Sequence, residues 1–212
     1  MLLGVMLLYV GAVLVVNGIW LIGQARAAER IAAPVRAEAP GGAGAAAPPP
    51  APPEPEADPL LLQNREVTVL NIFTGFVGIV CAATLLIHGD QKGDLASIRG
   101  GGFILLFAFT YLWVAANTFL GADGRAFGWY CLFVAVTAVA AGIYTFRDAN
   151  GNDASIWLGI DWFAWAVLWF MFFVLLALGR PIARATGALA ILEGIGTAWV
   201  FGFLLLQGTV SF

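Results

Sequence analysis

The stretch LLGVMLLYVGAVLVVNGIWLIG, residues 2–23, runs for 22 residues without a charged side chain. An α-helix of roughly 20 predominantly apolar residues crosses the hydrocarbon core of a bilayer, which is about 30 Å thick. The stretch therefore predicts a transmembrane helix. A cleaved signal peptide explains it less well, because no Lys or Arg precedes the run and the run is long for the apolar core of such a peptide. We interpret residues 1–23 as a retained transmembrane helix.

Five further apolar runs follow the first, and each is long enough to span a bilayer. Their approximate limits are residues 67–87, 102–120, 127–146, 157–178 and 187–206. Of the 212 residues, 61% are hydrophobic and only 11% are charged, whereas soluble domains have about 25% charged residues. Lipid cannot satisfy the open backbone of isolated strands, and the runs lack a two-residue alternation, so all six are expected to be helices. The predicted fold is an all-α membrane protein, a bundle of six transmembrane helices grouped as three hairpins.

The segment from residue 24 to residue 66 differs in composition from the spans on either side. It holds nine of the ten prolines, among alanines and glycines. This composition is typical of a low-complexity linker that is disordered or forms polyproline II helix. A docking tail for a proline-binding partner is the alternative. The chain is thus divided into a first span (1–23), a cytoplasmic linker (24–66) and the five remaining spans (67–212).

Basic residues near the ends of the spans predict the orientation of the chain in the membrane. With the N-terminus outside, the inside loops carry seven of them, Arg26, Arg30, Arg36, Arg65, Arg125, Arg180 and Arg184. The outside loops then carry three, Lys92, Arg99 and Arg147. Because basic residues concentrate on the inner face of a membrane, we expect both termini to lie outside.

Few polar side chains lie inside the predicted spans. Three are asparagines, Asn17, Asn71 and Asn117, and among ionisable residues we assign only Glu193 to the interior of a span. A carboxylate near the bilayer centre costs on the order of 3 kcal/mol on insertion scales, so Glu193 is expected to face the bundle interior and to find hydrogen-bond donors. The asparagines are the candidate donors, and Thr197 lies one helical turn after Glu193 on the same face. A Glu that only holds helices together is the structural alternative.

Aromatic residues are the second feature of the spans. Trp162, Trp165 and Trp169 fall at positions i, i+3 and i+7 and therefore share one stripe of a helix. Phe109 and Trp113 are spaced i, i+4 in the third span. An interfacial belt does not explain Trp165 and Trp169, which lie well inside their span. These two rings either pack in a core or line a lumen.

A lumen lined by aromatic rings with few polar atoms suits a small, flat, uncharged solute such as urea or acetamide. An ion must keep or replace its hydration shell, and these spans offer no ring of carbonyl dipoles or charged residues for that purpose. Close helix packing is expected at small residues. The candidates are Gly75, Gly78, Ala135, Ala138, Ala141, Gly142, Gly194 and Gly196.

Several classes of function are disfavoured by the sequence. The net charge of −3 leaves no basic surface for nucleic acid. Cys81 and Cys131 lie in apolar runs, where they indicate neither a disulfide framework nor a metal site. No Ser/His/Asp set, HExxH motif or metal cluster occurs near the spans, so we expect neither an enzyme nor a bound cofactor.

Several blocks of the sequence resemble a known family. FAFTYLWVAAN (107–117) and GWYCLFVA (128–135) are similar to the FxFTYLxxAxN and WYxLFVA blocks of the urea-channel and amide-transporter family of AmiS/UreI type, which is associated with ureases and amidases. Further similar blocks are LYVG (8–11) followed by Asn17-Gly18, WAVLW (165–169), and LEGI (192–195) followed by TAW (197–199). The matches occur in order along the chain and cover five of the six spans.

This resemblance implies a six-helix protomer with its own pore, assembled as a homohexamer in the bacterial plasma (inner) membrane. Such a protein passes urea or short aliphatic amides down their gradient, with a functional link to a cytoplasmic urease or amidase. The site residues that the resemblance implies are the constriction residues Phe109, Trp113, Trp165 and Trp169, the pore carboxylate Glu193, and the further lumen positions Trp162 and Asn17.

The chain departs from the family pattern in three places. Acid-gated members rely on histidine-rich outer loops that become protonated at about pH 5–6, whereas this chain has one histidine, His88, so we expect no acid gating. The Ala/Pro linker lengthens an inner loop. Trp113 stands where a tyrosine is common, which leaves the choice between urea and amides open.

Two alternatives to a passive channel stay open. One is a proton-coupled carrier of small amides that binds and releases a proton at Glu193 during transport. The other is a purely structural membrane subunit, which predicts no solute flux from the purified protein.

Overall fold

A computed structural model of the chain describes residues 2–37 and 58–212, and within them it contains helices but no strand. The elements are α1 (Leu2–Ala37), α2 (Asn64–Lys92), α3 (Leu95–Leu120), α4 (Arg125–Asp148), α5 (Asp153–Leu176), α6 (Ala183–Glu193), the π-helix η1 (Gly194–Val200) and α7 (Phe201–Leu206). Six helical stretches of this described part are long and apolar enough to span a membrane, α6, η1 and α7 counting as one. The predicted all-α fold with six spans is confirmed.

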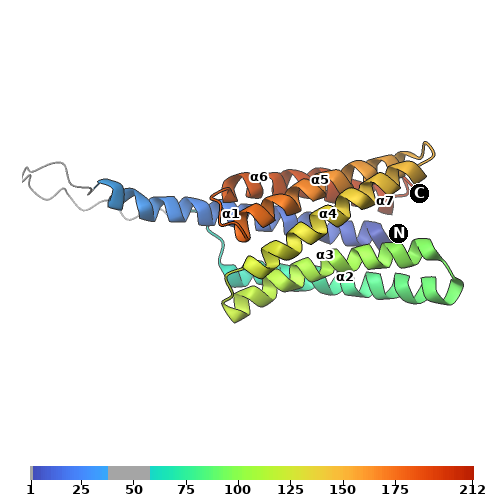
Figure 1. Cartoon of the computed structure of the whole chain (residues 1–212), viewed down its shortest axis with the longest axis horizontal. Helices are drawn as coiled ribbons and strands as arrows, with labels where there is room; N and C mark the ends of the chain where they lie inside the picture. Colours follow the sequence, from blue (N-terminus) through green and yellow to red (C-terminus); the bar gives the residue numbers. More distant parts are fainter. Residues whose placement is uncertain (1, 38–57) are drawn as a thin grey trace, which may run out of the picture.

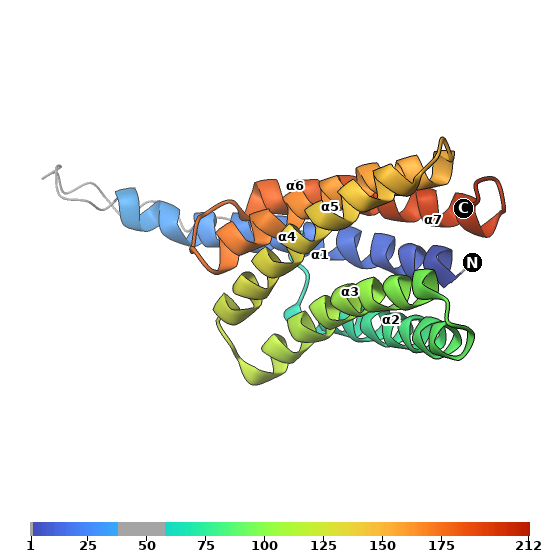
Figure 2. The same ribbon diagram turned by 45° about the vertical axis from the view of Figure 1, so that its right-hand side comes forward.

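The helices pack as three antiparallel hairpins (Figures 1 and 2). Short loops join α2 to α3 and α4 to α5, whereas the third hairpin is built from the two ends of the chain, α1 and the α6–η1–α7 segment. Figure 1 shows the N- and C-termini at one end of the bundle and the extension of α1 at the other. The first and last spans therefore meet only through tertiary packing.

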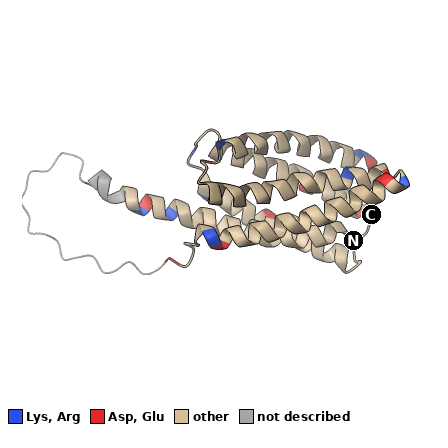
Figure 3. Ribbon diagram, turned by 90° about the horizontal axis from the view of Figure 1, so that it is seen from below, with Lys and Arg blue, Asp and Glu red and all other residues tan. Residues whose placement is uncertain are grey.

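The outer surface of the bundle is apolar along its length. Figure 3 shows the Lys and Arg residues at the two ends of the bundle and along the extension of α1. Large apolar side chains between these ends point outward, among them Phe73, Phe76, Trp129, Phe133 and Trp199. A continuous exposed surface of this kind fits a lipid environment.

Polar side chains cap the N-terminal ends of α3 and α5. Asp94 caps α3 by accepting a hydrogen bond from the Ala96 amide at 3.0 Å, and the Ser97 hydroxyl donates to its other oxygen at 2.5 Å. The bond from Ser97 is the main reason that the pKa of Asp94 lies below its usual value, because it stabilises the charged form. Asn152 caps α5 similarly, accepting from the Ser155 amide at 2.8 Å.

The outer helices of the three hairpins repeat one pattern of buried positions. Buried residues of α2 recur 60 positions later as buried residues of α4. The pairs are Thr68 and Gly128, Asn71 and Cys131, Thr74 and Val134, Gly75 and Ala135, and Gly78 and Ala138. The same positions of the third hairpin are Gly187, Ala190, Glu193 and Gly194. Three similar units thus surround one axis.

The contact between α1 and α6–η1–α7 brings two helix backbones together at glycines. The facing pairs are Gly4 with Gly202, Gly11 with Gly194, and Gly18 with Gly187. A Cβ atom on Gly18 would lie 2.5 Å from the carbonyl oxygen of Gly187. At Gly11 the corresponding distance, to the carbonyl oxygen of Gly194, would be 2.8 Å. Small residues of this kind let membrane helices approach closely.

The π-helix η1 keeps these glycines in register. On α1 the three glycines are seven residues apart, and Gly187 and Gly194 keep the same spacing, but Gly194 and Gly202 are eight apart. η1 occupies the residues between the last two, and a π-helical turn takes up one extra residue. Gly202 therefore faces Gly4 despite the unequal spacing.

Four of the predicted small contact residues meet neighbours closely, and one does not. A Cβ on Gly75, Gly78, Gly142 or Gly194 would lie within 3.0 Å of another atom. A Cβ on Gly196 would meet no neighbouring atom of the described residues within 4 Å. The expectation of close packing at Gly196 is wrong, because this residue of η1 faces away from α1.

Helix α1 extends further than predicted. It runs to Ala37, well past residue 23, through a segment rich in the helix formers Ala and Arg. Residues 58–64 return beside it, where Trp20 Nε1 donates to Asn64 Oδ1 at 2.9 Å and Arg30 lies 3.2 Å from Asp58. Part of the predicted linker is therefore helical, while its proline-rich part, residues 38–57, lies outside the described residues.

Gly11→Ala is expected to destabilise the bundle, because the new Cβ would lie 2.8 Å from a backbone carbonyl oxygen of Gly194. Overpacking of this kind costs about 1–3 kcal/mol. Thermal unfolding in detergent, followed by size-exclusion chromatography, measures the loss as a lower Tm. Gly196→Ala is the matched control and should keep the Tm of the wild type. Equal Tm values for the two variants would contradict the glycine contact.

Candidate functional site

Two cavities lie in line along the bundle, surrounded mainly by α1, α3 and α5. The larger has a volume of about 480 Å³ and the smaller about 50 Å³. On α1 the larger cavity is lined by residues from Leu3 to Val10 and the smaller by residues from Val10 to Leu21, and the same order holds on α3 and α5. The three helices therefore run in one direction along a common axis.

Three side chains line both cavities and mark the place where the two meet. They are Val10 of α1, Phe107 of α3 and Trp165 of α5, which we call the junction residues. Their exposed fractions are 1%, 7% and 2%. One residue from each of α1, α3 and α5 thus lies at the boundary between the two cavities.

Phe107 packs among the three indoles of α5. Its ring centroid lies 5.7 Å from that of Trp162, 5.1 Å from that of Trp165 and 4.8 Å from that of Trp169. Trp162 lines the larger cavity, Trp169 the smaller and Trp165 both. The two alternatives for the tryptophan stripe, packing in a core and lining a lumen, are therefore compatible. Each indole packs against Phe107 and also borders a cavity.

A chain of hydrogen bonds orients the indole of Trp165. Trp165 Nε1 donates to Thr197 Oγ1 at 2.8 Å, and Thr197 Oγ1 donates to the backbone carbonyl of Glu193 at 2.6 Å. Thr197 lies in η1, so the π-helix presents the hydroxyl that holds the ring. The polar atom of a junction residue is thereby satisfied away from the cavities.

Asn17 and Asn71 form a buried pair between α1 and α2. Asn71 Nδ2 donates to Asn17 Oδ1 at 2.8 Å, and Asn17 Nδ2 donates to Asn71 Oδ1 at 3.2 Å. Asn17 also lines the smaller cavity, whereas Asn71 does not. The asparagines were expected to donate to Glu193. Asn17 and Asn71 instead pair with each other. Gly194, the residue after Glu193, packs against Gly11, which precedes Asn17 by six residues on α1.

Phe109 and Trp113 line neither cavity of the described structure. Phe109 is 47% exposed on the outer surface of α3, and Trp113 packs against Phe127 and Tyr130 of α4 with centroids 5.9 and 5.4 Å apart. Asn117, half-buried at the end of α3, also lines neither cavity. The expected constriction at Phe109 and Trp113 therefore needs correction.

The register of α3 explains this correction. Each residue turns a helix by about 100°, so Phe109 faces nearly opposite Phe107. The inward face is formed by Phe107, Tyr111 and Val114, spaced i, i+4 and i+7. The sequence shows this spacing, but Phe109 and Trp113 are also spaced i, i+4. Spacing alone therefore does not tell which of the two pairs faces inward.

Two carboxyl groups are buried beside the cavities. Glu193 is 5% exposed and Asp161 of α5 is 1% exposed. Among the described residues, Glu193 Oε2 and Asp161 Oδ2 have no hydrogen-bond partner, and neither side chain lines a cavity. The sequence assigned only Glu193 to a span interior. Asp161 lies only four residues after Trp157, where its predicted span begins, so the sequence did not indicate that it is deeply buried.

The smaller cavity suits a small neutral solute better than an ion. The smaller cavity is lined by aromatic and aliphatic side chains with three polar ones, Asn17, Thr110 and Tyr111. An ion would have to give up its hydration shell against these surfaces, whereas a flat neutral molecule exchanges only a few hydrogen bonds. In the part of the chain that the structure describes, no cluster of three His, Cys, Asp or Glu side chains could hold a metal ion.

Comparison with known proteins identifies relatives over most of the chain. Residues 60–209 match the family model of the AmiS/UreI family transporters. A protein of Mycolicibacterium smegmatis named for the transport of amidate substrates is 35% identical over 206 residues, which cover 97% of this chain and 76% of that protein. The acid-activated urea channel of Helicobacter pylori is 31% identical over 225 residues, covering 96% of each chain. The crystal structure of the Helicobacter pylori urea channel matches this fold over the full length of both chains, with a TM-score of 0.72.

Asn17→Ala is expected to lower the stability of the bundle by about 1–2 kcal/mol, because it leaves the buried amide of Asn71 without its partner. A double-mutant cycle with Asn71→Ala should give a coupling of about 0.5–2 kcal/mol in detergent unfolding. Asn117→Ala, which removes an asparagine outside this pair, is the control and should leave the Tm near that of the wild type. Additive effects of the two single changes would show that the pair does not stabilise the helices.

Proposed function

Because the chain belongs to the AmiS/UreI family of transporters, we propose that it is a passive membrane channel for urea and short-chain aliphatic amides. Its family makes it a multi-pass membrane transport protein and not an enzyme. The observation that carries the channel proposal is the pair of in-line cavities that meet at Val10, Phe107 and Trp165.

Selection is proposed to occur at the junction residues and along the smaller cavity. Phe107 and Trp165 offer ring faces that contact a flat solute, and Trp169 and Tyr111 continue this lining beyond them. Such surfaces favour thin, neutral molecules and give an ion no replacement for its hydration. Urea, formamide and acetamide are the expected solutes, with longer amides passing more slowly.

The channel is proposed to be insensitive to acid, although one relative is named as an acid-activated urea channel. His88, the single histidine of the chain, is exposed at the end of α2. The lowered pKa of nearby Asp94 keeps this carboxylate charged at about pH 5–7.5. Its stabilising contribution is lost only as the pH falls through that lowered pKa. A single histidine is not the histidine-rich set of outer-loop groups on which acid gating is expected to depend.

The assembly and location are also proposals. Six copies would form a hexamer in the bacterial plasma (inner) membrane, with one pore in each protomer and both termini outside. The apolar outer surface of the hairpins supports contact with lipid or with neighbouring copies. The extension of α1, which carries Arg26 and Arg30, then lies on the inner side, as the distribution of basic residues favours. A cytoplasmic urease or amidase would consume the solute.

Phe107→Ala is expected to raise the flux of propionamide relative to urea by about three- to tenfold, because it widens the junction. Stopped-flow light scattering on proteoliposomes, with urea, formamide, acetamide and propionamide, measures the ratio. Phe109→Ala is the matched control, since it removes the same side chain from the outer surface of the same helix. Its ratio should stay within about twofold of the wild type. A shift with Phe109→Ala and none with Phe107→Ala would overturn the assignment of the junction.

Urea flux is expected to be equal at an external pH of about 5 and about 7.5, and to survive collapse of the proton gradient. Glu193→Gln should retain flux within about twofold, because Glu193 lines neither cavity and Gln keeps its size. Glu66→Gln, at the start of α2, is the control for loss of a carboxylate. Loss of flux in Glu193→Gln together with dependence on the proton gradient would favour the alternative, a proton-coupled carrier.

A further inference from the structure

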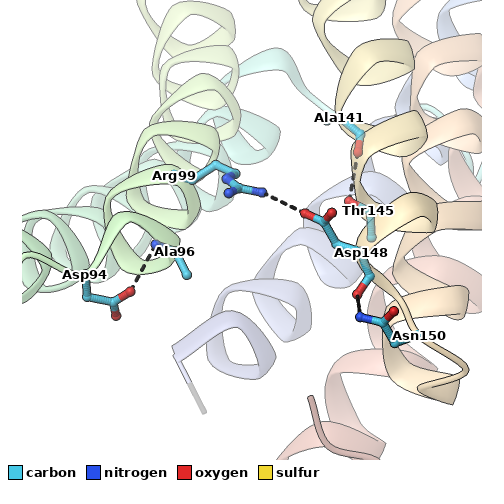
Figure 4. A network of polar contacts seen from close by, with 7 residues as sticks. All are labelled: Asp94, Ala96, Arg99, Ala141, Thr145, Asp148 and Asn150. Carbon is cyan, nitrogen blue, oxygen red and sulfur yellow. Dashed lines mark hydrogen bonds and ion pairs between the residues drawn. The ribbon is translucent and has the colours of Figure 1, made fainter.

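An ion pair spans the mouth of the larger cavity. Arg99 of α3 reaches across to Asp148, the last residue of α4, with 3.4 Å between Nη1 and Oδ2 (Figure 4). Both residues line the cavity, whose other end is formed by the junction residues. The side chains are 47% and 65% exposed. A solute that enters this cavity from the end where the two termini lie therefore passes the pair.

The pair is poorly suited to a purely structural role. Ion pairs between exposed side chains contribute little to stability, and this one has a single long contact. Asp148 also stands at the C-terminal end of α4, where the helix dipole disfavours a carboxylate. Neither the ion pair nor the helix dipole therefore gives Asp148 a clear stabilising role in the fold.

The pair supplies free hydrogen-bonding groups of both charges at the mouth, where the hydroxyls of two other lining residues, Thr145 and Ser97, are already bonded. The hydroxyl of Thr145 donates to the Ala141 carbonyl at 2.8 Å (Figure 4), and that of Ser97 donates to Asp94. The guanidinium group of Arg99 has five N–H donors, of which the contact with Asp148 uses one. Asp148 keeps its second oxygen as an acceptor. A positively charged donor group and a negatively charged acceptor therefore lie side by side at the mouth of a mainly apolar cavity.

We propose that Arg99 and Asp148 form an entry site that binds the primary amide group of the solute before it reaches the junction residues. Arg99 donates to the carbonyl oxygen of the amide, and Asp148 accepts from its N–H. The inference rests on the proposed function, since it deepens the recognition of the same solutes.

This chemistry discriminates an amide from a carboxylate of equal size. Acetamide offers one acceptor and two donors, so both members of the pair can bind it. Acetate offers acceptors alone. It can bind Arg99 only next to the carboxylate of Asp148, which already pairs with that guanidinium and repels a second negative charge. The site therefore favours the substrate of an amidase over its product.

Binding and flux are measured separately to test the site. Saturation-transfer NMR on the full chain in nanodiscs, with acetamide or acetate as the probe, reports binding; light scattering reports the half-saturation concentration for acetamide flux. Arg99→Gln and Asp148→Asn are each expected to weaken acetamide binding, and to raise the half-saturation concentration, by about three- to tenfold. Wild-type protein should show binding of acetamide and not of acetate.

A conservative variant separates recognition from a structural tie. Arg99→Lys keeps the charge facing Asp148 but loses the planar fork of donors, so it should keep the wild-type Tm and still weaken acetamide binding. The controls are Arg147→Gln and Asp153→Asn. The side chain of Arg147 lies over the ring of Tyr144, and Asp153 is in the first turn of α5. Neither residue lines the cavity, and both variants should bind acetamide as the wild type does.

Each outcome decides the proposal. Acetamide binding unchanged in Arg99→Gln or in Asp148→Asn overturns the entry site, even where flux is normal, and so does acetate that binds as strongly as acetamide. Binding that weakens in Arg99→Lys at unchanged Tm supports it. If the wild-type protein binds acetamide with this dependence on Arg99 and Asp148 but shows no flux, the entry site is supported and the channel proposal is refuted.

Discussion

The close backbone contact between α1 and α6–η1–α7 is the constraint on which the rest of the structure depends. The first span is separated from the second by a long linker, so no short loop holds it in the bundle. Glycines on both sides let the two segments approach, and the π-helix adds the residue that keeps the last pair facing. Val10 directly precedes one of these glycines, Gly11. The same contact therefore brings the α1 side chain to the place where Phe107 and Trp165 meet.

The boundary between the cavities is held by packing and by one hydrogen-bonded chain. Phe107 inserts among the three indoles of α5, and Thr197 holds the nitrogen of Trp165. These contacts restrain the rings that the proposed selection of solutes depends on. The π-helix serves both features, because it aligns the glycines and carries Thr197.

Polar groups are arranged by depth along the proposed path. The charged pair stands at the mouth, where water limits its cost, and the deeper lining is aromatic with a few neutral polar groups. The buried carboxyls of Asp161 and Glu193 lie beside the cavities instead of inside them. On the proposed path a neutral solute would meet hydrogen-bonding groups first and apolar ring faces afterwards, an order that would favour molecules with a low cost of dehydration.

The sequence by itself determined the six spans, the all-α class and the family, since twenty apolar residues and ordered motifs are local properties of the chain. It also placed Trp162, Trp165 and Trp169 on one stripe. Only the tertiary structure decided that Phe107 and not Phe109 faces inward, and that Asn17 pairs with Asn71. In a membrane bundle the lipid-facing and inward-facing sides of a helix are both apolar, so hydrophobic periodicity discriminates poorly between them. The inward side is set by contacts between helices that are far apart in the chain.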